Sequence, residues 1–257
     1  MIEGGIVKLR VILDLEGRDV YWQMAIDEAL LHLRINGRID NTLRLYRFKP
    51  SAVTIGYFQR IRDSVNIDYL NANGIDYTRR ITGGGSVYHD SSGEITYSIV
   101  LPAEGALVDI LESYRVLCGA LVYALRKIGL QAEFVPINDV VVYGRKISGS
   151  AQTRRLGYIL QHGTLMYATD LDTLEKALVA PREKLVSKGV RSIRERVVTI
   201  KEVLGSVDVD QLVKSLIEGF SRALNAEVYY DELSGEEIRV ASEIVTKYRS
   251  HEWIYRR

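Results

Sequence analysis

The order in which strand-like and helix-like segments follow one another is the feature that most limits the fold of this chain. Segments typical of strands occur at residues 7–15, 43–46, 52–57, 86–89, 94–101 and 159–168. Segments with helical apolar spacing occur at residues 21–34, 67–73, 108–128, 209–224 and 236–248. A doubly wound parallel sheet would need regular alternation of the two types, which is not seen. We therefore predict an α+β fold with helices flanking a mixed, largely antiparallel sheet.

The length favours one domain over residues 1–257, because the chain shows no repeat and no long linker. The helices expected at about residues 208–250 would pack on that domain. The clearest helix, residues 108–128, carries an apolar stripe at positions 111, 114, 118, 121, 125 and 128. Cys118, the single cysteine, lies on this stripe and is predicted to be a buried and therefore inert thiol.

A glycine-rich segment at residues 79–90 is the first candidate binding element. Arg79 and Arg80 precede three consecutive glycines, Gly83–Gly85, and a β-prone segment follows. Glycines let a backbone approach a ligand closely, and successive free amides form an anion-binding concavity. The arginines add charge suited to phosphate. The alternative is an ordinary flexible loop beside a solvated arginine pair.

A second candidate element covers residues 138–152. Lys146 follows a glycine turn and precedes small residues, Ser148–Ala151, that leave room for a narrow ligand channel. A lysine on rigid backbone can act as a fixed charge toward a phosphate or carboxylate. The alternative is a hairpin with an exposed lysine at its tip.

Composition excludes several functional classes. A net charge of +1 with balanced acids and bases argues against a nucleic-acid partner. No apolar run approaches the roughly 18 residues of a membrane span, and the first ten residues lack a signal-peptide core. We expect a cytoplasmic protein without an intramolecular disulfide or a cysteine-based metal site. The small numbers of cysteine and methionine hint at a thermophilic source.

Taken together, these motifs resemble the lipoate–protein ligase family. The similarity rests on Arg-Arg-x-Thr-Gly-Gly-Gly-x-Val-Tyr-His-Asp, Asn-Asp, Gly-Arg-Lys-Ile-Ser-Gly-Ser-Ala and Gln-His-Gly-Thr-Leu, in the family's order between Arg79 and Leu165. It covers roughly residues 8–255 and is closest to the archaeal-type large catalytic subunit, which lacks the C-terminal domain of many bacterial enzymes.

The resemblance implies a biotin/lipoate ligase-like catalytic fold and a two-step reaction. ATP with Mg²⁺ would activate lipoate to lipoyl-AMP, and a lysine of a lipoyl domain would then take the lipoyl group. Acceptors would be a 2-oxoacid dehydrogenase acyltransferase subunit or the glycine cleavage H protein. A small separate accessory subunit is expected, equivalent to the missing C-terminal domain.

The resemblance also implies roles for individual residues. Lys146 would be the catalytic residue, contacting both the lipoate carboxyl group and the α-phosphate. The expected ligands of ATP and the adenylate are Arg80, Gly83, Gly84, Gly85, Ser86, Val87, Tyr88, His89, Asn138, Asp139 and Lys146. The expected lipoate-binding residues are Lys146, Gly149, Ser150, Ala151 and His162. Asp139 would be the residue that reaches Mg²⁺, and Arg194 and Arg196 would belong to a loop that closes over the adenylate.

Two alternatives stay open. The first is an octanoyl or lipoyl transferase that uses octanoyl carrier protein and no ATP. Residues 150–154 and 159–163 are typical of that branch, but the segment before Gly144-x-Lys146 lacks the branch's nucleophilic cysteine. The second is a non-catalytic subunit that binds lipoate or an adenylate. Lipoate and octanoate are not distinguished, since both fit an apolar channel.

Overall fold

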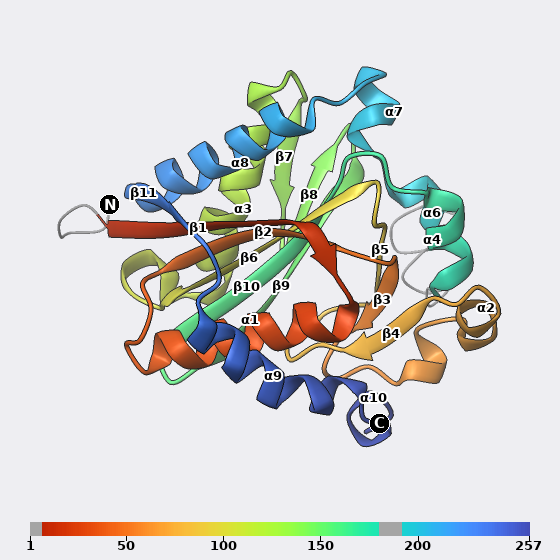
Figure 1. Ribbon diagram of the computed structural model, residues 1–257. Coiled ribbons are helices and arrows are strands. Elements are labelled where there is room, and N and C mark those ends of the chain that lie inside the picture. The colour runs from red at the N-terminus through yellow and green to blue at the C-terminus, as the bar shows by residue number, and fades with distance from the viewer. Residues whose placement is uncertain (1–6, 180–191) are drawn as a thin grey trace.

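The computed structural model describes residues 7–179 and 192–257. One eight-stranded sheet and one three-stranded sheet form its frame (Figure 1). The large sheet has the strand order β11-β1-β2-β6-β10-β9-β8-β7, and the small sheet has the order β4-β3-β5. The strands are β1 (Val7–Arg18), β2 (Thr42–Phe48), β3 (Ala52–Ile55), β4 (Asp76–Arg79), β5 (Val87–His89), β6 (Glu94–Pro102), β7 (Ala132–Val135), β8 (Asp139–Val142), β9 (Arg145–Arg155), β10 (Tyr158–Met166) and β11 (Ala226–Asp231).

Most neighbouring strands run antiparallel, and the pairs β1–β11, β1–β2 and β3–β4 run parallel. This confirms the predicted α+β class with a mixed, largely antiparallel sheet. The helices are α1 (Val20–Ile35), α2 (Ile67–Ala72), α3 (Ile110–Lys127), α4 (Leu171–Ala177), α6 (Ile193–Arg196), α7 (Ile200–Leu204), α8 (Val209–Leu224), α9 (Gly235–Arg249) and α10 (His251–Ile254), with 3₁₀ turns η1 (Ile61–Asp63) and η2 (Gly105–Leu107).

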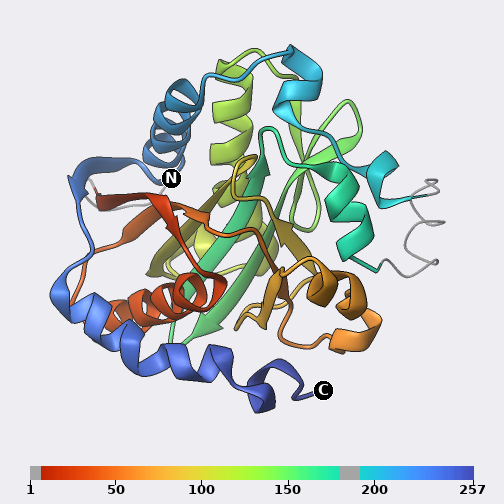
Figure 2. The same ribbon diagram turned by 45° about the vertical axis from the view of Figure 1, so that its right-hand side comes forward.

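Helices cover both faces of the large sheet. Helices α3 and α8 pack on one face around Leu117, Leu121 and Phe220. Helices α1 and α9 lie side by side on the other face, as Figure 2 shows. Strand β6 is therefore buried over almost its whole length, and its polar residues Glu94, Thr96 and Ser98 are buried with the apolar ones.

Local signals set the helix ends. Asp208 caps α8 by accepting from the Gln211 amide, and Asn225 ends that helix in the left-handed conformation at φ 49°. A Ser234–Glu237 capping box opens α9. In helix α3 the predicted stripe is partly wrong, because Leu111 is 48% exposed at the first turn.

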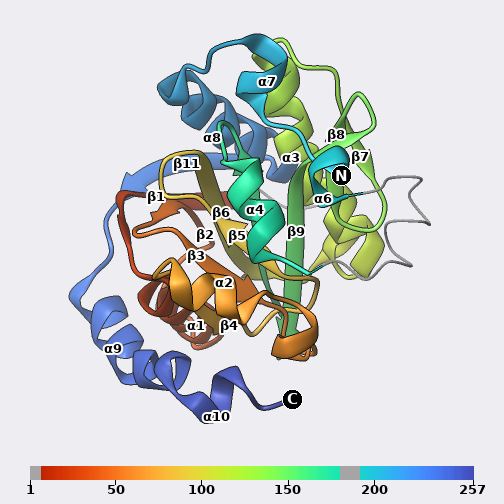
Figure 3. The same ribbon diagram turned by 90° about the vertical axis from the view of Figure 1, so that its right-hand side faces the viewer.

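The small sheet lies beside one end of the large one and has its own apolar cluster. Val53, Ile55 and Tyr88 of the small sheet pack against Leu70 of α2 and Leu174 of α4. Both helices lie beside the small sheet (Figure 3). No helix in the described part of the chain is both long and apolar enough to cross a membrane.

Candidate functional site

A cavity between the two sheets collects most of the residues singled out in the sequence. It is lined by Arg80, Gly84, Gly85, Ser86, Val87, Tyr88, His89, Asn138, Lys146, Gly149, Ser150, Ala151, His162 and Arg196, among others. Of the remaining candidates, Gly83 lies in the same glycine loop and Asp139 contacts Lys146. Arg194 instead pairs with Glu202 at 2.5 Å. Chain folding thus joins the two motifs, while the roles implied for their residues stay predictions.

The glycine loop, residues 82–86, is supported from below by Arg80. Arg80 is 3% exposed, and burial lowers the pKa of its guanidinium to about 10. Its Nη2 donates to the carbonyls of Gly83 and Gly85 at 2.6 and 2.7 Å, and its Nε donates to Thr82 Oγ1 at 3.0 Å. Its Nη1 donates to both oxygens of Thr54 at 3.3 and 3.4 Å. All five N–H groups therefore bond to the protein, which makes Arg80 a brace of the loop.

The preceding arginine also has a structural environment. Arg79 is fully buried, and it donates to the carbonyls of Gly56, Tyr57, Gln59, Trp253 and Ile254. This arginine therefore ties the turn after β3 to helix α10. Both arginines of the pair donate to oxygens of the protein itself, which differs from the fork for phosphate that the sequence suggested.

A close approach of two glycines adds a second constraint on the loop. A Cβ atom built on Gly56 would lie 2.1 Å from the Gly84 carbonyl oxygen and 3.1 Å from that of Gly83. Both contacts are to backbone, so the loop would have to move. Gly84 itself has φ +87°, which favours glycine.

The variant Gly56→Ala is therefore expected to lower the free energy of unfolding by about 1–3 kcal/mol. It should also lose activity, because the added Cβ displaces the loop. Urea unfolding monitored by circular dichroism measures the first effect. Gly119→Ala is the matched control, since a Cβ there meets nothing within 4 Å on a helix and should be stabilising by about 0.5–1 kcal/mol. Equal stability of the two variants would contradict the close contact.

Lys146 lies at the start of β9, after the predicted hairpin turn, and its side chain reaches the cavity wall. Its Nζ is 2.6 Å from Asp139 Oδ1, and Arg196 Nη2 is 3.0 Å from Asp139 Oδ2. The Lys146 carbonyl also accepts from the Val198 amide at 2.9 Å. A Cβ on Gly149 would lie 2.2 Å from Lys146 Nζ. Gly149 thus leaves the space that the end of the Lys146 side chain occupies.

The proposed Mg²⁺ contact at Asp139 does not fit a site built by the protein. Both carboxylate oxygens already face cations, Lys146 and Arg196. In residues 7–179 and 192–257, no group of three or more His, Cys, Asp or Glu side chains is placed to hold a metal ion.

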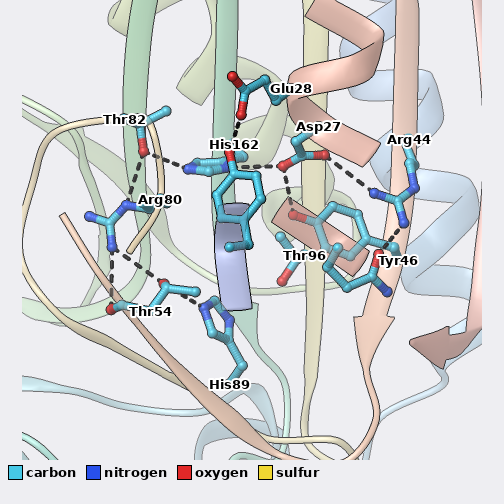
Figure 4. Close-up of polar contacts among 12 residues, drawn as sticks. Asp27, Glu28, Arg44, Tyr46, Thr54, Arg80, Thr82, His89, Thr96 and His162 are labelled. Carbon is cyan, nitrogen blue, oxygen red and sulfur yellow. Dashed lines mark hydrogen bonds and ion pairs between the residues drawn. The ribbon is translucent and has the colours of Figure 1, made fainter. Parts of the chain in front are cut away.

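Two buried histidines reach the cavity, and each is bonded to a buried carboxylate. His162 Nδ1 is 2.9 Å from Asp27 Oδ2 (Figure 4). His89 Nδ1 is 2.8 Å from Glu94 Oε1. Burial lowers the pKa of His162, against the opposing effect of Asp27. The sequence analysis missed Asp27 and Glu94. A signal existed for Asp27, because it lies among apolar residues on the buried face of the helix predicted at 21–34.

Cys118 is buried in α3, as predicted. Its Sγ is 3.5 Å from Ser150 Oγ, and Ser150, unlike Cys118, lines the cavity. Burial raises the pKa of Cys118 to about 11. The thiolate, which is the nucleophilic form, is therefore strongly disfavoured at neutral pH.

The fold and the cavity define an enzyme of the biotin/lipoate ligase catalytic class. The lipoyl protein ligase A/B catalytic domain model matches residues 19–221, so the chain belongs to that family. It is 36% identical to octanoyltransferase LipM of Kyrpidia tusciae, over 92% of this chain and 94% of that enzyme. It is 34% identical to octanoyltransferase LipM of Staphylococcus aureus, over 93% and 96%.

The solved structures point to the same family. A bipartite lipoate protein ligase of Thermoplasma acidophilum, studied with its E2 lipoyl domain, superposes with a TM-score of 0.84 and 34% identity, covering 98% of this chain and 97% of that one. This enzyme therefore acts in protein lipoylation, a modification of proteins.

The expectation of ATP-dependent lipoate ligation is wrong, because the curated relatives that match over nearly the full length are octanoyltransferases. The missing cysteine before Gly144 favoured ligation, whereas segments 150–154 and 159–163 are typical of transferases. A glycine loop, a lysine and an acyl channel serve both reactions, so these motifs do not separate them. The segments typical of the transferase branch agree with the similarity to octanoyltransferases.

Proposed function

We propose that this chain transfers an octanoyl group from octanoyl carrier protein to a lysine of a lipoyl domain, without ATP. The observation that carries this proposal is its identity of 36% with an octanoyltransferase over 92% of the chain. The cavity supports it, because apolar side chains suited to an acyl chain line it, namely Met24, Val87, Met166, Leu174 and Leu178.

The chemistry proposed is a direct transfer from donor to acceptor. The acceptor lysine amine attacks the thioester carbonyl carbon and forms a C–N bond. The tetrahedral intermediate then collapses, the C–S bond breaks, and the carrier thiol leaves with the proton that the amine loses. This route needs no protein nucleophile, and the only cysteine of the sequence, Cys118, is fully buried.

Lys146 is the residue to which we assign charge stabilisation. Its ammonium group would oppose the negative charge that develops on the thioester oxygen. Asp139 holds that ammonium at 2.6 Å and Gly149 leaves room for it. Positioning of donor and acceptor supplies the remainder of the rate enhancement, as in other reactions that need no bound nucleophile.

The proposed acceptors are lipoyl domains of a 2-oxoacid dehydrogenase acyltransferase subunit or the glycine cleavage H protein. The Thermoplasma ligase structure was studied with an E2 lipoyl domain, which supports this choice. A separate accessory subunit stays a prediction. A transfer assay with the isolated chain tests it, because full activity would argue against the need for such a subunit.

The isolated protein is expected to octanoylate a lipoyl domain when octanoyl carrier protein is the only acyl source. Mass spectrometry of the lipoyl domain measures the product. Cys118→Ser should retain at least about half of the wild-type rate, because a thiol with a pKa near 11 contributes no thiolate at neutral pH.

Two outcomes would overturn the proposal. One is modification that requires free octanoate or lipoate together with ATP and fails with octanoyl carrier protein. The other is loss of transfer in folded Cys118→Ser, with an octanoyl adduct on Cys118 of the wild type, which would replace direct transfer by a covalent route. Ser215→Ala, another buried helical position, controls for disturbance of the core.

A further inference from the structure

The charge of Arg80 has no direct counter-ion among the described residues. All five of its N–H groups bond to neutral oxygens, from Thr82, Thr54, Gly83 and Gly85. A buried cation is costly unless its charge is balanced nearby. The two threonine hydroxyls that accept from Arg80 each continue into a further hydrogen bond.

The first chain of bonds runs from Arg80 to helix α1. Arg80 Nε donates to Thr82 Oγ1 at 3.0 Å, and Thr82 Oγ1 is 2.7 Å from His162 Nε2. His162 Nδ1 is 2.9 Å from Asp27 Oδ2. Figure 4 shows this chain crossing from the glycine loop to the helix. Thr82 is fully buried and Asp27 is 1% exposed.

The second chain repeats the first with different residues. Arg80 Nη1 donates to Thr54 Oγ1 at 3.3 Å, and Thr54 Oγ1 is 2.9 Å from His89 Nε2. His89 Nδ1 is 2.8 Å from Glu94 Oε1. Both chains therefore have the order arginine, threonine, histidine, carboxylate.

The donor and acceptor properties of these groups determine which atom donates each hydrogen bond in both chains. An ionised carboxylate only accepts, so the Nδ1 atom of each histidine must carry the proton. In a neutral ring Nε2 is then an acceptor, and it takes the threonine hydroxyl proton. That leaves the hydroxyl oxygen free to accept from Arg80. The opposite tautomer would set a nitrogen lone pair against a carboxylate.

We propose that these twin chains are a positioning device that fixes Arg80, and through it the carbonyls of Gly83 and Gly85, under the acyl-transfer cavity. The polarised chains connect the arginine cation to the carboxyl groups of Asp27 and Glu94. His89 and His162 are then positioning residues that keep one tautomer, and they exchange no proton with the substrate. The activity assay for this inference rests on the proposed function, whereas its spectroscopic test does not.

Removing either hydroxyl should disturb the loop. Thr82→Val and Thr54→Val are each expected to lower kcat/KM by about 10- to 100-fold, because a small misplacement of binding groups has effects of that size. Thr82→Ser and Thr54→Ser keep the hydroxyl and should restore most of the rate. Circular dichroism melting of each variant shows that it is folded under assay conditions.

Thr42→Val is the matched control. Thr42 Oγ1 accepts from Arg10 Nε at 3.1 Å, and Thr42 is 1% exposed. Arg10 has its own carboxylate, Glu237. The control therefore loses the same type of buried arginine–threonine bond away from the cavity, and transfer should change by less than about twofold, as expected for a site independent of the loop.

Threonine variants made in an Arg80 variant distinguish a connected hydrogen-bond chain from two independent structural hydrogen bonds. In an Arg80→Gln background, Thr82→Val and Thr54→Val should have little further effect on kcat/KM, because the group they position is gone. If each still costs as much as in the wild type, the threonines do not act through Arg80 and the proposal fails.

Nitrogen-15 NMR of the histidine rings tests the chains without any activity. The sequence has four histidines, and His89→Gln and His162→Gln assign the two that matter. At neutral pH both should be Nδ1–H tautomers. In Thr82→Val the His162 Nε2 signal should move toward that of a nitrogen without a hydrogen bond, and in Thr42→Val it should not move.

The two tests fail in different ways. Nε2–H tautomers, or a His162 signal unaffected by Thr82→Val, would overturn the chains even if octanoyl transfer is measured. A wild type with the expected tautomers but no octanoyl transfer would overturn the proposed function and leave the chains standing.

Discussion

Lys146→Ala is expected to lower octanoyl transfer about 100- to 1,000-fold, the usual effect of removing one group that stabilises a developing oxyanion. Lys146 is the cavity-lining residue to which we assign that charge, and its Nζ is already held by Asp139 at 2.6 Å. Initial rates at saturating octanoyl carrier protein and lipoyl domain measure the loss. Because the stabilisation concerns the transition state, kcat should fall far more than KM rises.

Arg145→Ala is the control for this prediction. Arg145 is the neighbour of Lys146 on β9 and precedes it in the strand, so its side chain leaves on the opposite face. We expect less than a threefold change for it, as for a surface substitution outside the site. A Lys146→Ala enzyme that keeps more than a tenth of the wild-type kcat would rule out the assigned role.

Asp27→Ala is expected to destabilise the fold by about 3–5 kcal/mol, because it leaves a buried cation without one of its partners. Asp27 accepts from Arg44 at 3.3 Å, from Tyr46 at 2.9 Å and from His162 at 2.9 Å. Arg44 is fully buried, and among the residues that the structure describes only Asp14 remains as its ion-pair partner in the variant. Urea unfolding at pH 7 measures the change in free energy.

The same interaction predicts a pH dependence. Burial alone raises the pKa of Asp27, but the hydrogen bond from His162 and the charge of Arg44 outweigh it, so the folded-state pKa lies below the ordinary value. The carboxylate therefore stabilises the protein above the unfolded-state pKa, and this contribution is lost as the pH falls through the folded-state pKa. The difference in the free energy of unfolding between wild type and Asp27→Ala should be largest at pH 7 and should decrease at acidic pH.

Asp172→Ala supplies the comparison for both measurements. Its side chain is 82% exposed and lies 4.0 Å from Arg194. Exposed pairs of this kind are worth at most about 1 kcal/mol. If Asp27→Ala costs no more than Asp172→Ala, the buried network contributes no stability of its own.

Local periodicity predicted the elements well, because each helix stripe is a property of a continuous segment. The helix expected at residues 209–224 is observed as α8, Val209–Leu224, with caps that are legible in the sequence. Strand β11 was not foreseen, since its parallel pairing with β1 depends on residues more than two hundred positions apart. Leu111 was wrongly placed on the buried stripe, because the first turn of α3 is exposed to solvent.

The two site motifs were legible for a similar reason. Gly84–Tyr88 and Lys146–Ala151 are short segments whose glycines and charges are unusual in themselves, and both line the cavity. The choice between ligation and transfer was not legible from the same residues, because both reactions need an acyl channel and a fixed cation. The full-length similarity to octanoyltransferases is what favours transfer.

The sequence by itself determined the class of fold, the buried thiol of Cys118 and the two segments that meet at the cavity, since each follows from local spacing and polarity. Only the tertiary structure decided which partners the charged side chains have. Asp27 lies on helix α1 and His162 on strand β10, yet they are 2.9 Å apart. Such a contact depends on how helix and sheet pack, and for this reason the arginine expected to bind phosphate is found bracing the loop from inside.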